Sequence, residues 1–380
     1  MGYCSFSADD LVVRIVTSDI FSGDAIGNFI LQIRSFLDSK NIPNKLYATN
    51  YDIHAGLSIN HFDEFFDEYT DNDVLLSHYS IYEERNRRLL DVNIPKAVYF
   101  HGITPPEYFD SYDEITARNC RKGLEQYNCF SNFDYYMSNS AYMLDQLLSM
   151  ISGDDNFQKN ELSRRSLVCP PFINSTQWDY VSSDCVDLSK GKLALLYVGR
   201  LAPHKAVHEL FELLEVIVSK GVDASLRIVG GCAASIYCQE LNDLLNDRYI
   251  GIKERVMIYG HVTQSKLKYL YESSDVFVTM SEHEGFCVPL VEAMRFSLPI
   301  LAKGSGAIPE TLSGSGMVFY DNDYEKMADY LVGLMQKELK DSVLSKQDAV
   351  YGNILKAADG EIILSVLEKL VKKRSLNRAS

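Results

Sequence analysis

Residues 282–292 read Glu-His-Glu-Gly-Phe-Cys-Val-Pro-Leu-Val-Glu, so two carboxylates, Glu284 and Glu292, flank a glycine turn and a proline. Pro289 suits the first position of a helix, where the missing N–H of a proline costs nothing. A helix that begins there places Glu292 in its first turn and Glu284 on the loop before it. Carboxylates bind sugar hydroxyls, and the positive end of a helix binds phosphate. The stretch therefore predicts a sugar-nucleotide site.

Further segments surround this stretch in a fixed order. They are an apolar strand with a Gly-Arg turn and a lysine, a strand with a glycine turn, two more strands and a glycine-rich loop: Tyr197–Lys205, Leu226–Gly231, Val256–Gly260, Ser274–Val278 and Gly304–Glu310. With the two glutamates, this ordered set resembles the signature of the retaining family 4 glycosyltransferases over about residues 190–325. The N-terminal half matches that family more loosely.

The length of 380 residues exceeds what one hydrophobic core usually spans, which predicts two domains. Strand-like runs such as Leu11–Val16 and Lys96–His101 alternate with helical stretches such as Asn28–Ser39. This alternation predicts an α/β fold with parallel sheets and helices on both faces. The polar run after Cys169–Phe172 indicates a domain boundary.

The resemblance adds an architecture to this expectation. It implies the GT-B fold, in which two Rossmann-like, doubly wound domains face each other across a cleft. We expect an N-terminal acceptor-binding domain over residues 1–185 and a nucleotide-sugar-binding domain over residues 186–354. A final helix, about residues 355–380, is expected to pack back on the first domain.

The resemblance also implies roles for four charged residues. Arg200 and Lys205 would neutralise the donor diphosphate as it leaves, because fixed cations stabilise the charge that develops on it. Glu292 would accept hydrogen bonds from the ribose hydroxyls, and Glu284 would lie beside the transferred sugar. Since Arg200 and Lys205 supply charge that a divalent ion supplies elsewhere, we expect a metal-independent reaction with no metal site and no bound cofactor.

Other site residues follow from the same resemblance. The backbone N–H groups of Phe286, Cys287 and Val288 are expected at the donor sugar and diphosphate. His101, in the context His-Gly-Ile-Thr-Pro, is expected to touch the donor sugar near the reaction centre. Gly27 lies in a turn, residues 23–28, that would approach the donor phosphate or the acceptor, although this turn lacks the family's usual double glycine.

Two residues at another strand end, His78 and Tyr79, are further candidates for contact with the acceptor. A structural role is an equally good interpretation of both. The sequence around them does not decide between the two.

Composition restricts the remaining possibilities. The net charge of −15 disfavours nucleic-acid binding, which depends on a basic surface. The eight cysteines have no framework spacing, although Cys232 and Cys238 lie close together, so reduced thiols in a cytoplasmic protein are expected. No run reaches the roughly 18 apolar residues of a membrane span, and the N-terminus lacks signal-peptide regions. The basic stretch Glu368–Arg374 favours a solvated helix end over peripheral contact with a membrane.

The resemblance is strongest to bacterial mannosyltransferases of O-antigen and related surface polysaccharides. It implies GDP-mannose as donor and a lipid-linked oligosaccharide as acceptor, with polysaccharide-assembly proteins as further partners at the inner membrane. A UDP-hexose donor is the first alternative. A sugar-nucleotide epimerase is the second, but it is not expected to carry the Glu-x7-Glu pattern of Glu284 and Glu292. From another class, the chain could be a non-catalytic glycan-binding or scaffold subunit, and the joint presence of Arg200, Lys205, Glu284 and Glu292 argues against it.

Overall fold

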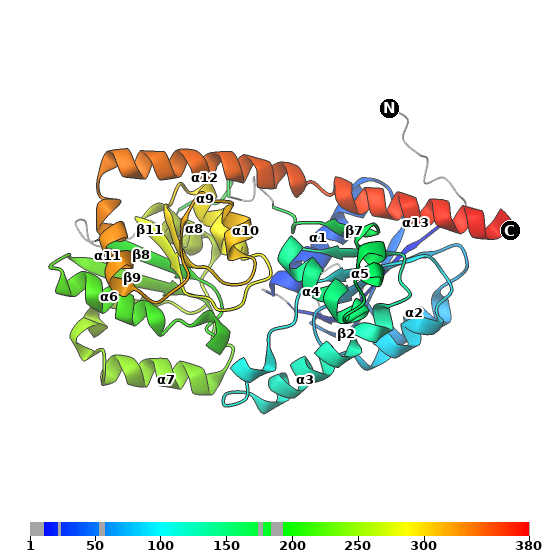
Figure 1. Ribbon diagram of the computed structural model, residues 1–380, viewed down its shortest axis with the longest axis horizontal. Coiled ribbons are helices and arrows are strands. Elements are labelled where there is room, and N and C mark those ends of the chain that lie inside the picture. The colour runs from blue at the N-terminus through cyan, green and yellow to red at the C-terminus, as the bar shows by residue number, and fades with distance from the viewer. Residues whose placement is uncertain (1–10, 22–23, 53–57, 174–177, 184–192, 380) are drawn as a thin grey trace. The chain divides into compact units, whose positions relative to one another are not determined.

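A computed structural model describes residues 11–21, 24–52, 58–173, 178–183 and 193–379. The chain divides into two compact units (Figure 1). The N-terminal unit comprises residues 1–105, 118–173 and 356–380, and the C-terminal unit comprises residues 106–117 and 174–355. The short segment Pro106–Ala117 therefore packs with the C-terminal unit although its neighbours in sequence belong to the other one.

The N-terminal unit is built on a parallel sheet with the strand order β3-β2-β1-β4-β5-β6-β7. Its described strands are β1 (Val13–Ile20), β2 (Asn44–Tyr51), β3 (Asn60–His61), β4 (Val74–Tyr79), β5 (Lys96–Phe100), β6 (Tyr135–Ser138) and β7 (Ser166–Val168). Every residue of β4 and β5 is buried, as expected for central strands covered on both faces. The order reverses direction beside β1, which creates a topological switch point between β1 and β4.

The C-terminal unit repeats this plan with the strand order β10-β9-β8-β11-β12-β13. Its described strands are β8 (Leu193–Val198), β9 (Ala224–Val229), β10 (Val256–Ile258), β11 (Val276–Thr279), β12 (Ile300–Lys303) and β13 (Met317–Phe319). All their pairings are parallel. The switch point lies between β8 and β11. Both units are thus Rossmann-like, which confirms the predicted fold class.

Helices connect successive strands in both units (Figure 1). In the N-terminal unit they are α1 (Ala25–Ser39), α2 (Phe62–Glu68), α3 (Glu114–Glu125, shared between the units), α4 (Ala141–Ser152), α5 (Asn156–Ser163) and α13 (Glu361–Ala379). In the C-terminal unit they are α6 (Glu209–Ser219), α7 (Ser235–Asn246), α8 (Gln264–Glu272), α9 (Val288–Arg295), α10 (Ile308–Leu312), α11 (Tyr324–Gly333) and α12 (Lys337–Ala357).

The first strand and helix differ in their bounds from the prediction. Strand β1 extends to Ile20, four residues further than the apolar run indicated, because the polar residues Thr17 and Ser18 are also buried. Helix α1 begins at Ala25 rather than Asn28, because the side chain of Asp24 accepts a hydrogen bond from Gly27 N and caps the helix. An N-terminal cap therefore marked this boundary better than the apolar periodicity did.

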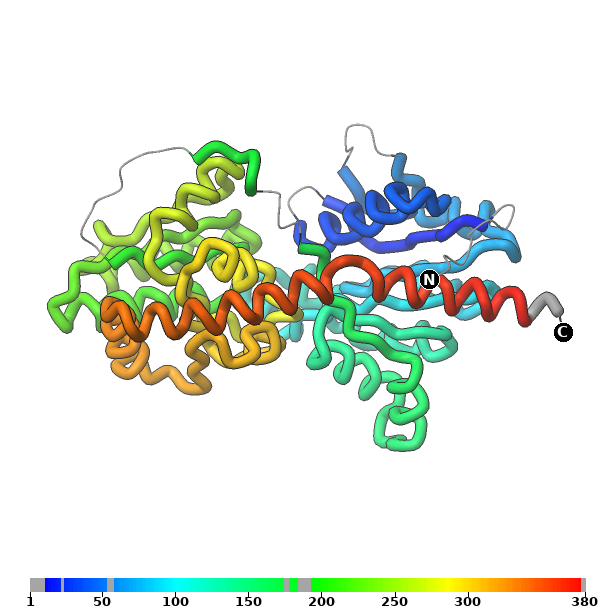
Figure 2. Tube along the Cα trace, turned by 90° about the horizontal axis from the view of Figure 1, so that it is seen from above, coloured from blue at the N-terminus to red at the C-terminus, as the bar shows by residue number. Residues whose placement is uncertain are grey.

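The C-terminal helix α13 is part of the N-terminal unit, while α12 before it packs on the C-terminal unit (Figure 2). Ile363, Val366 and Leu370 of α13 are buried in the core formed by α1 and the central strands. The basic end of the helix also contacts this unit, where Lys373 pairs with Asp134 and Arg374 donates to Asn72 O. These two cations are therefore engaged by the protein itself.

The expectation that all cysteines are reduced is wrong for one pair. Cys232 and Cys238 form a disulfide, with Cα atoms 6.2 Å apart, between the loop after β9 and the first turns of α7. A separation of six residues brings two side chains together at a loop–helix junction without any framework spacing in the sequence. Cys120, Cys129, Cys169 and Cys287 are buried; Cys4 and Cys185 lie outside the described residues.

The sequence predicts no membrane span. None of the helices in the described ranges combines the length and the apolar character that a membrane span requires.

Candidate active site

Most of the residues predicted for donor binding gather at the carboxyl edge of the C-terminal sheet, while His101 and Gly27 belong to the N-terminal unit. Arg200 lies two residues beyond β8, and Glu284 lies on the loop after β11, the neighbouring strand. Ligands of open α/β sheets bind outside this edge at the switch point. The fold therefore brings the upstream Gly-Arg turn and the first glutamate to the position where a ligand is expected.

A short ion pair joins two of the predicted residues. Lys205, at the end of the turn Pro203–Lys205, places Nζ 2.7 Å from Glu284 Oε1, and their side chains are only 15% and 11% exposed. Arg200 is exposed and forms no ion pair with any residue that the structure describes. The site thus holds one lysine balanced by a carboxylate and one arginine with its charge available to an anion.

Close packing of two backbone turns holds Arg200 in place. Gly230, after β9, has a φ of 145°, and a Cβ at this residue would lie 1.9 Å from Gly199 O. Gly199 N also donates to Val229 O at 2.9 Å. Only glycine allows this approach, so the glycine turn after β9 supports the position of the Gly-Arg turn after β8.

The turn Phe286–Val288 presents backbone donors. Cys287 adopts a left-handed conformation, with φ 68° and ψ 70°, directly before α9. Within the described part of the chain, the N–H groups of Phe286, Cys287 and Val288 donate to no other residue. Consecutive unpaired N–H groups at a left-handed turn before a helix form an anion-binding concavity.

Helix α9 begins one residue earlier than predicted. Val288 is its first residue and Pro289 its second, so Glu292 is the fifth residue and lies beyond the first turn. Proline is compatible with this second position because the N–H of that residue also lacks an intrahelical partner.

Glu292 is partly buried and hydrogen-bonded. Tyr271, on α8, donates its hydroxyl to Glu292 Oε2 at 2.8 Å. Burial raises the pKa of Glu292 to about 7, and the hydrogen bond from Tyr271 opposes this only in part. A carboxylate in this environment gains from any additional donor, such as a hydroxyl group of a ligand.

Two histidines that were not predicted lie beside the ion pair. His204 is buried, and its pKa lies well below the ordinary value because of burial and the nearby charge of Lys205. Its ring contacts Phe109, at 5.6 Å between ring centres, and His283, at 6.5 Å. Burial lowers the pKa of His283 to about 4. Both rings are therefore neutral and leave the positive charge to Arg200 and Lys205. Their proximity to Lys205 and Glu284 in sequence was the available signal.

The N-terminal unit places His101 directly after the central strand β5. Its Nε2 lies 2.9 Å from Nδ1 of His78, the penultimate residue of the adjacent strand β4. Both histidines are buried against Phe29, whose ring centre lies 5.8 Å from that of His101 and 6.2 Å from that of His78. His101 thus lies at the carboxyl edge of its own sheet.

The other candidates of this unit are engaged in structural contacts. Tyr79 is fully buried, and its hydroxyl donates to Gly123 O, so contact with an acceptor is the wrong interpretation for this residue. Gly27 is buried in α1 and its N–H donates to Asp24, so its proposed contact with a phosphate remains a prediction. Gly23, the first residue of the predicted turn, lies outside the described residues.

The described ranges contain no group of three or more His, Cys, Asp or Glu residues that could hold a metal ion. The sequence contains Asp-x-Asp at 71–73 and 321–323. Asp73 instead pairs with Arg14 at 2.9 Å, and Asp323 caps α11 and pairs with Lys326 at 2.6 Å. Metal independence itself remains a prediction.

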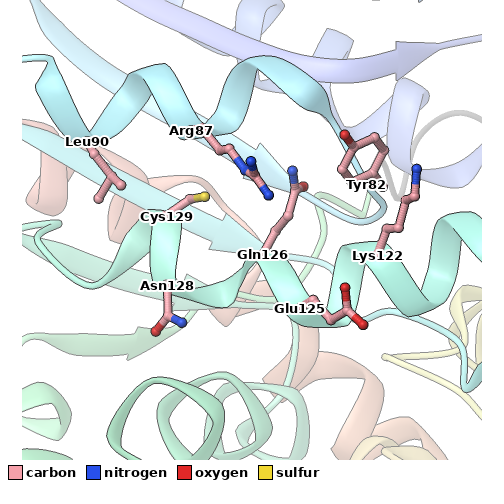
Figure 3. Close-up of a pocket in the computed structure, with 8 residues that line it drawn as sticks. All are labelled: Tyr82, Arg87, Leu90, Lys122, Glu125, Gln126, Asn128 and Cys129. Carbon is pink, nitrogen blue, oxygen red and sulfur yellow. The ribbon is translucent and has the colours of Figure 1, made fainter.

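A separate cavity of about 490 Å³ lies in the N-terminal unit, between the 3₁₀ helix Glu84–Asp91 and the end of α3 (Figure 3). Arg87, Lys122 and Glu125 contribute its charges, and Gln126 is held by hydrogen bonds to the backbone of Glu83. None of the predicted site residues lines it. The cavity therefore does not mark the site assembled above.

Gly306 holds the backbone of Glu284, which leads to a prediction. Its φ is 57°, and a Cβ would lie 2.5 Å from Glu284 O, the atom that accepts from Ala307 N. Gly306→Ala is expected to displace Glu284 and lower kcat/KM about tenfold, the equivalent of about 1.4 kcal/mol. Steady-state kinetics check this. Gly314→Ala is the matched control, because φ is 78° but a Cβ there meets open space; equal losses in the two variants would contradict a specific effect on Glu284.

Comparison with known proteins identifies the domain that carries most of these residues. Residues 186–349 match the family described as Glycosyl transferases group 1. This segment contains the Gly-Arg turn, the ion pair Lys205–Glu284 and α9. The C-terminal unit therefore contains a group 1 glycosyltransferase domain, in agreement with the resemblance seen in the sequence.

Relatives of the chain include enzymes of polysaccharide assembly. It is 27% identical over 144 residues to a capsular polysaccharide biosynthesis glycosyltransferase, CapM, of Staphylococcus aureus, covering 37% of this chain and 36% of that protein. It is 26% identical to O-antigen chain mannosyltransferase B of Escherichia coli, covering 63% and 61%. It is 30% identical to the GDP-mannose:cellobiosyl-diphosphopolyprenol alpha-mannosyltransferase of Xanthomonas campestris, covering 37% of each. The chain thus spans less than two thirds of these relatives.

Solved structures share the fold over nearly the whole chain. A glycosyltransferase from Rickettsia africae superposes with a TM-score of 0.70 at 14% identity, over 96% of this chain and all of that one. HepE from Anabaena, solved in complex with UDP, superposes with a TM-score of 0.65 at 16% identity, over 95% and 100%. At these identities the comparison establishes the two-domain GT-B fold.

Proposed function

We propose that this protein is a retaining glycosyltransferase that transfers mannose from GDP-mannose to a lipid-linked glycan during the assembly of a surface polysaccharide. The observation that carries the proposal is the ion pair Lys205–Glu284 beside the available charge of Arg200 and the unpaired N–H groups of residues 286–288. This arrangement fits a sugar diphosphate, because it combines cations and N–H donors for phosphate with carboxylates for hydroxyl groups.

The proposed reaction needs only the residues described above. The bond between the sugar's anomeric carbon and the diphosphate breaks while an acceptor hydroxyl forms a new bond on the same face. The departing phosphate takes the proton of that hydroxyl. Arg200, Lys205 and the N–H groups stabilise the negative charge that builds on the leaving group. Glu292 accepts hydrogen bonds from the ribose, and His101 contacts the sugar. We propose that no divalent ion takes part.

The nucleotide and sugar are inferred from the relatives. Two of them are called mannosyltransferases, and one name includes GDP-mannose and a diphosphopolyprenol acceptor. A uridine donor is the second candidate, since the related fold of HepE holds UDP. Contact with polysaccharide-assembly proteins or a membrane surface, and a cytoplasmic location, belong to the proposal in the same way.

Calorimetry with purified protein and no added metal tests the proposal. We expect GDP and GDP-mannose to bind, and UDP and UDP-hexoses to bind at least tenfold more weakly. Selective binding of uridine nucleotides would overturn GDP-mannose as the donor and would leave the assignment of the binding site unchanged. Binding of neither class would favour the glycan-binding scaffold. Transfer that is lost in a chelator and restored by Mg²⁺ would contradict metal independence.

A further inference from the structure

His78 and His101 form a buried pair at the carboxyl edge of the N-terminal sheet. Strands β4 and β5 are neighbours with His78 opposite Tyr99, which places the two imidazoles side by side. His78 Nδ1 lies 2.9 Å from His101 Nε2, and the rings are nearly parallel at 26°. The mechanism above uses only His101, so the role of His78 remains to be explained.

Both rings are neutral at physiological pH. Burial lowers the pKa of His78 to about 3 and holds the pKa of His101 well below its ordinary value. A neutral imidazole has one N–H and one nitrogen with a lone pair. The contact between the rings is therefore a hydrogen bond in which one histidine donates and the other accepts, and its direction decides both tautomers.

The far side of His78 indicates that direction. Its Nε2 is buried and has no hydrogen-bond partner. A buried N–H without an acceptor is rarer in proteins than an acceptor without a donor, so Nε2 carries the lone pair and Nδ1 the proton. His78 Nδ1–H then donates to His101 Nε2, and the proton of His101 lies on its own Nδ1.

We propose that His78 is a positioning residue that fixes His101 in the orientation and tautomer with an N–H at Nδ1. His101, which remains 9% exposed, then offers a hydrogen-bond donor to an oxygen atom and has no free lone pair to act as a base. That the oxygen belongs to the donor sugar rests on the proposed function; the tautomer does not.

Nitrogen NMR of the full-length protein, labelled with ¹⁵N-histidine, tests the tautomer without any substrate. The signals of the two residues are assigned from His78→Asn and His101→Asn. We expect a protonated Nδ1 and an unprotonated Nε2 in both rings of the wild-type protein. Protonation of His101 at Nε2 would overturn the proposal, whatever the chain's activity.

Kinetics test the consequence for catalysis. His78→Leu removes the hydrogen-bond donor and replaces it with an apolar side chain of similar size. This variant is expected to lower kcat about tenfold, which corresponds to the loss of one hydrogen bond, and to change KM less. His78→Asn can place an amide N–H where Nδ1 was and is expected to restore most of the rate. Thermal unfolding identifies a variant that is simply destabilised.

Three outcomes separate the proposals. Full activity in a folded His78→Leu variant would overturn the positioning role. Failure of His78→Asn to exceed His78→Leu would overturn the role of the donated hydrogen bond. Absence of sugar transfer by the wild-type protein with every donor would reject the proposed function, while NMR would still decide the tautomer.

Discussion

Lys205→Met is expected to lower kcat for sugar transfer about 100- to 1,000-fold. Removing one group that stabilises developing negative charge typically costs about 3–4 kcal/mol of transition-state stabilisation. Lys205 Nζ lies in a largely enclosed position, 15% exposed, where charge is poorly screened by solvent. A change in KM smaller than the change in kcat is expected, because the charge on the diphosphate grows only as the bond to the sugar breaks. Steady-state kinetics with saturating donor measure the effect.

The matched control for this change is Lys220→Met. Lys220 is also a lysine of the C-terminal unit with a carboxylate at 2.7 Å, but it follows α6, at the end distant from the carboxyl edge, and pairs with Glu325 and Asp329. Its replacement should leave kcat within about twofold of the wild-type value, since exposed ion pairs contribute little to the stability of the fold. Equal kcat values for the Lys205 and Lys220 variants would contradict the role of Lys205. Melting temperatures of both show whether the unpaired Glu284 affects folding.

Local patterns in the sequence predicted where most of the candidate residues of the C-terminal unit lie. Arg200 and Lys205 follow an apolar run, and Glu284 follows another, so each stands at the end of a strand. Parallel strands bring their carboxyl ends to one edge, and in the structure Lys205 lies beside Glu284 there. These residues were predictable because position along a strand fixes the edge at which a side chain lies.

Partners distant in sequence were less predictable. Tyr271 donates to Glu292 from a different helix, 21 residues earlier in the chain. The chain has 24 tyrosines, and nothing in the sequence distinguishes this one from the others. The contact between His78 and His101, at the ends of the neighbouring strands β4 and β5, likewise has no mark in the sequence. Phe109 belongs to the segment Pro106–Ala117, which packs with the C-terminal unit although the residues on either side of the segment belong to the other unit. These contacts depend on side-chain packing, which has no short-range signal.

The raised pKa of Glu292 should make the nucleotide-free protein less stable as pH rises. Its pKa is about 7 in the folded protein, against an ordinary value of 4.5. Between these values the folded chain binds more protons than the unfolded chain, so stability falls with increasing pH. The stabilisation that comes from the raised pKa of Glu292 is complete below pH 4.5 and is lost as the pH rises through 7. From pH 5 to pH 8 the loss is about 2.5 kcal/mol.

Unfolding free energies of the wild type and Glu292→Gln, measured across this range, isolate the effect. The amide does not titrate and keeps the size and the acceptor oxygen of the side chain, so all other titrating groups cancel in the difference. The wild type should lose about 2.5 kcal/mol relative to the variant between pH 5 and pH 8. Parallel curves for the two proteins would show that Glu292 is already ionised at pH 5.

Nucleotide binding should have the opposite pH dependence. Ribose hydroxyls that donate to Glu292 favour its charged form, so binding has to supply the free energy of ionisation below pH 7. At pH 6 only about a tenth of a group with a pKa of about 7 is ionised. The affinity of the wild type for GDP should therefore rise about tenfold from pH 6 to pH 8 relative to Glu292→Gln. Calorimetry in two buffers of different ionisation enthalpy would detect the accompanying proton release. Binding without proton release at pH 6 would place the ribose away from Glu292.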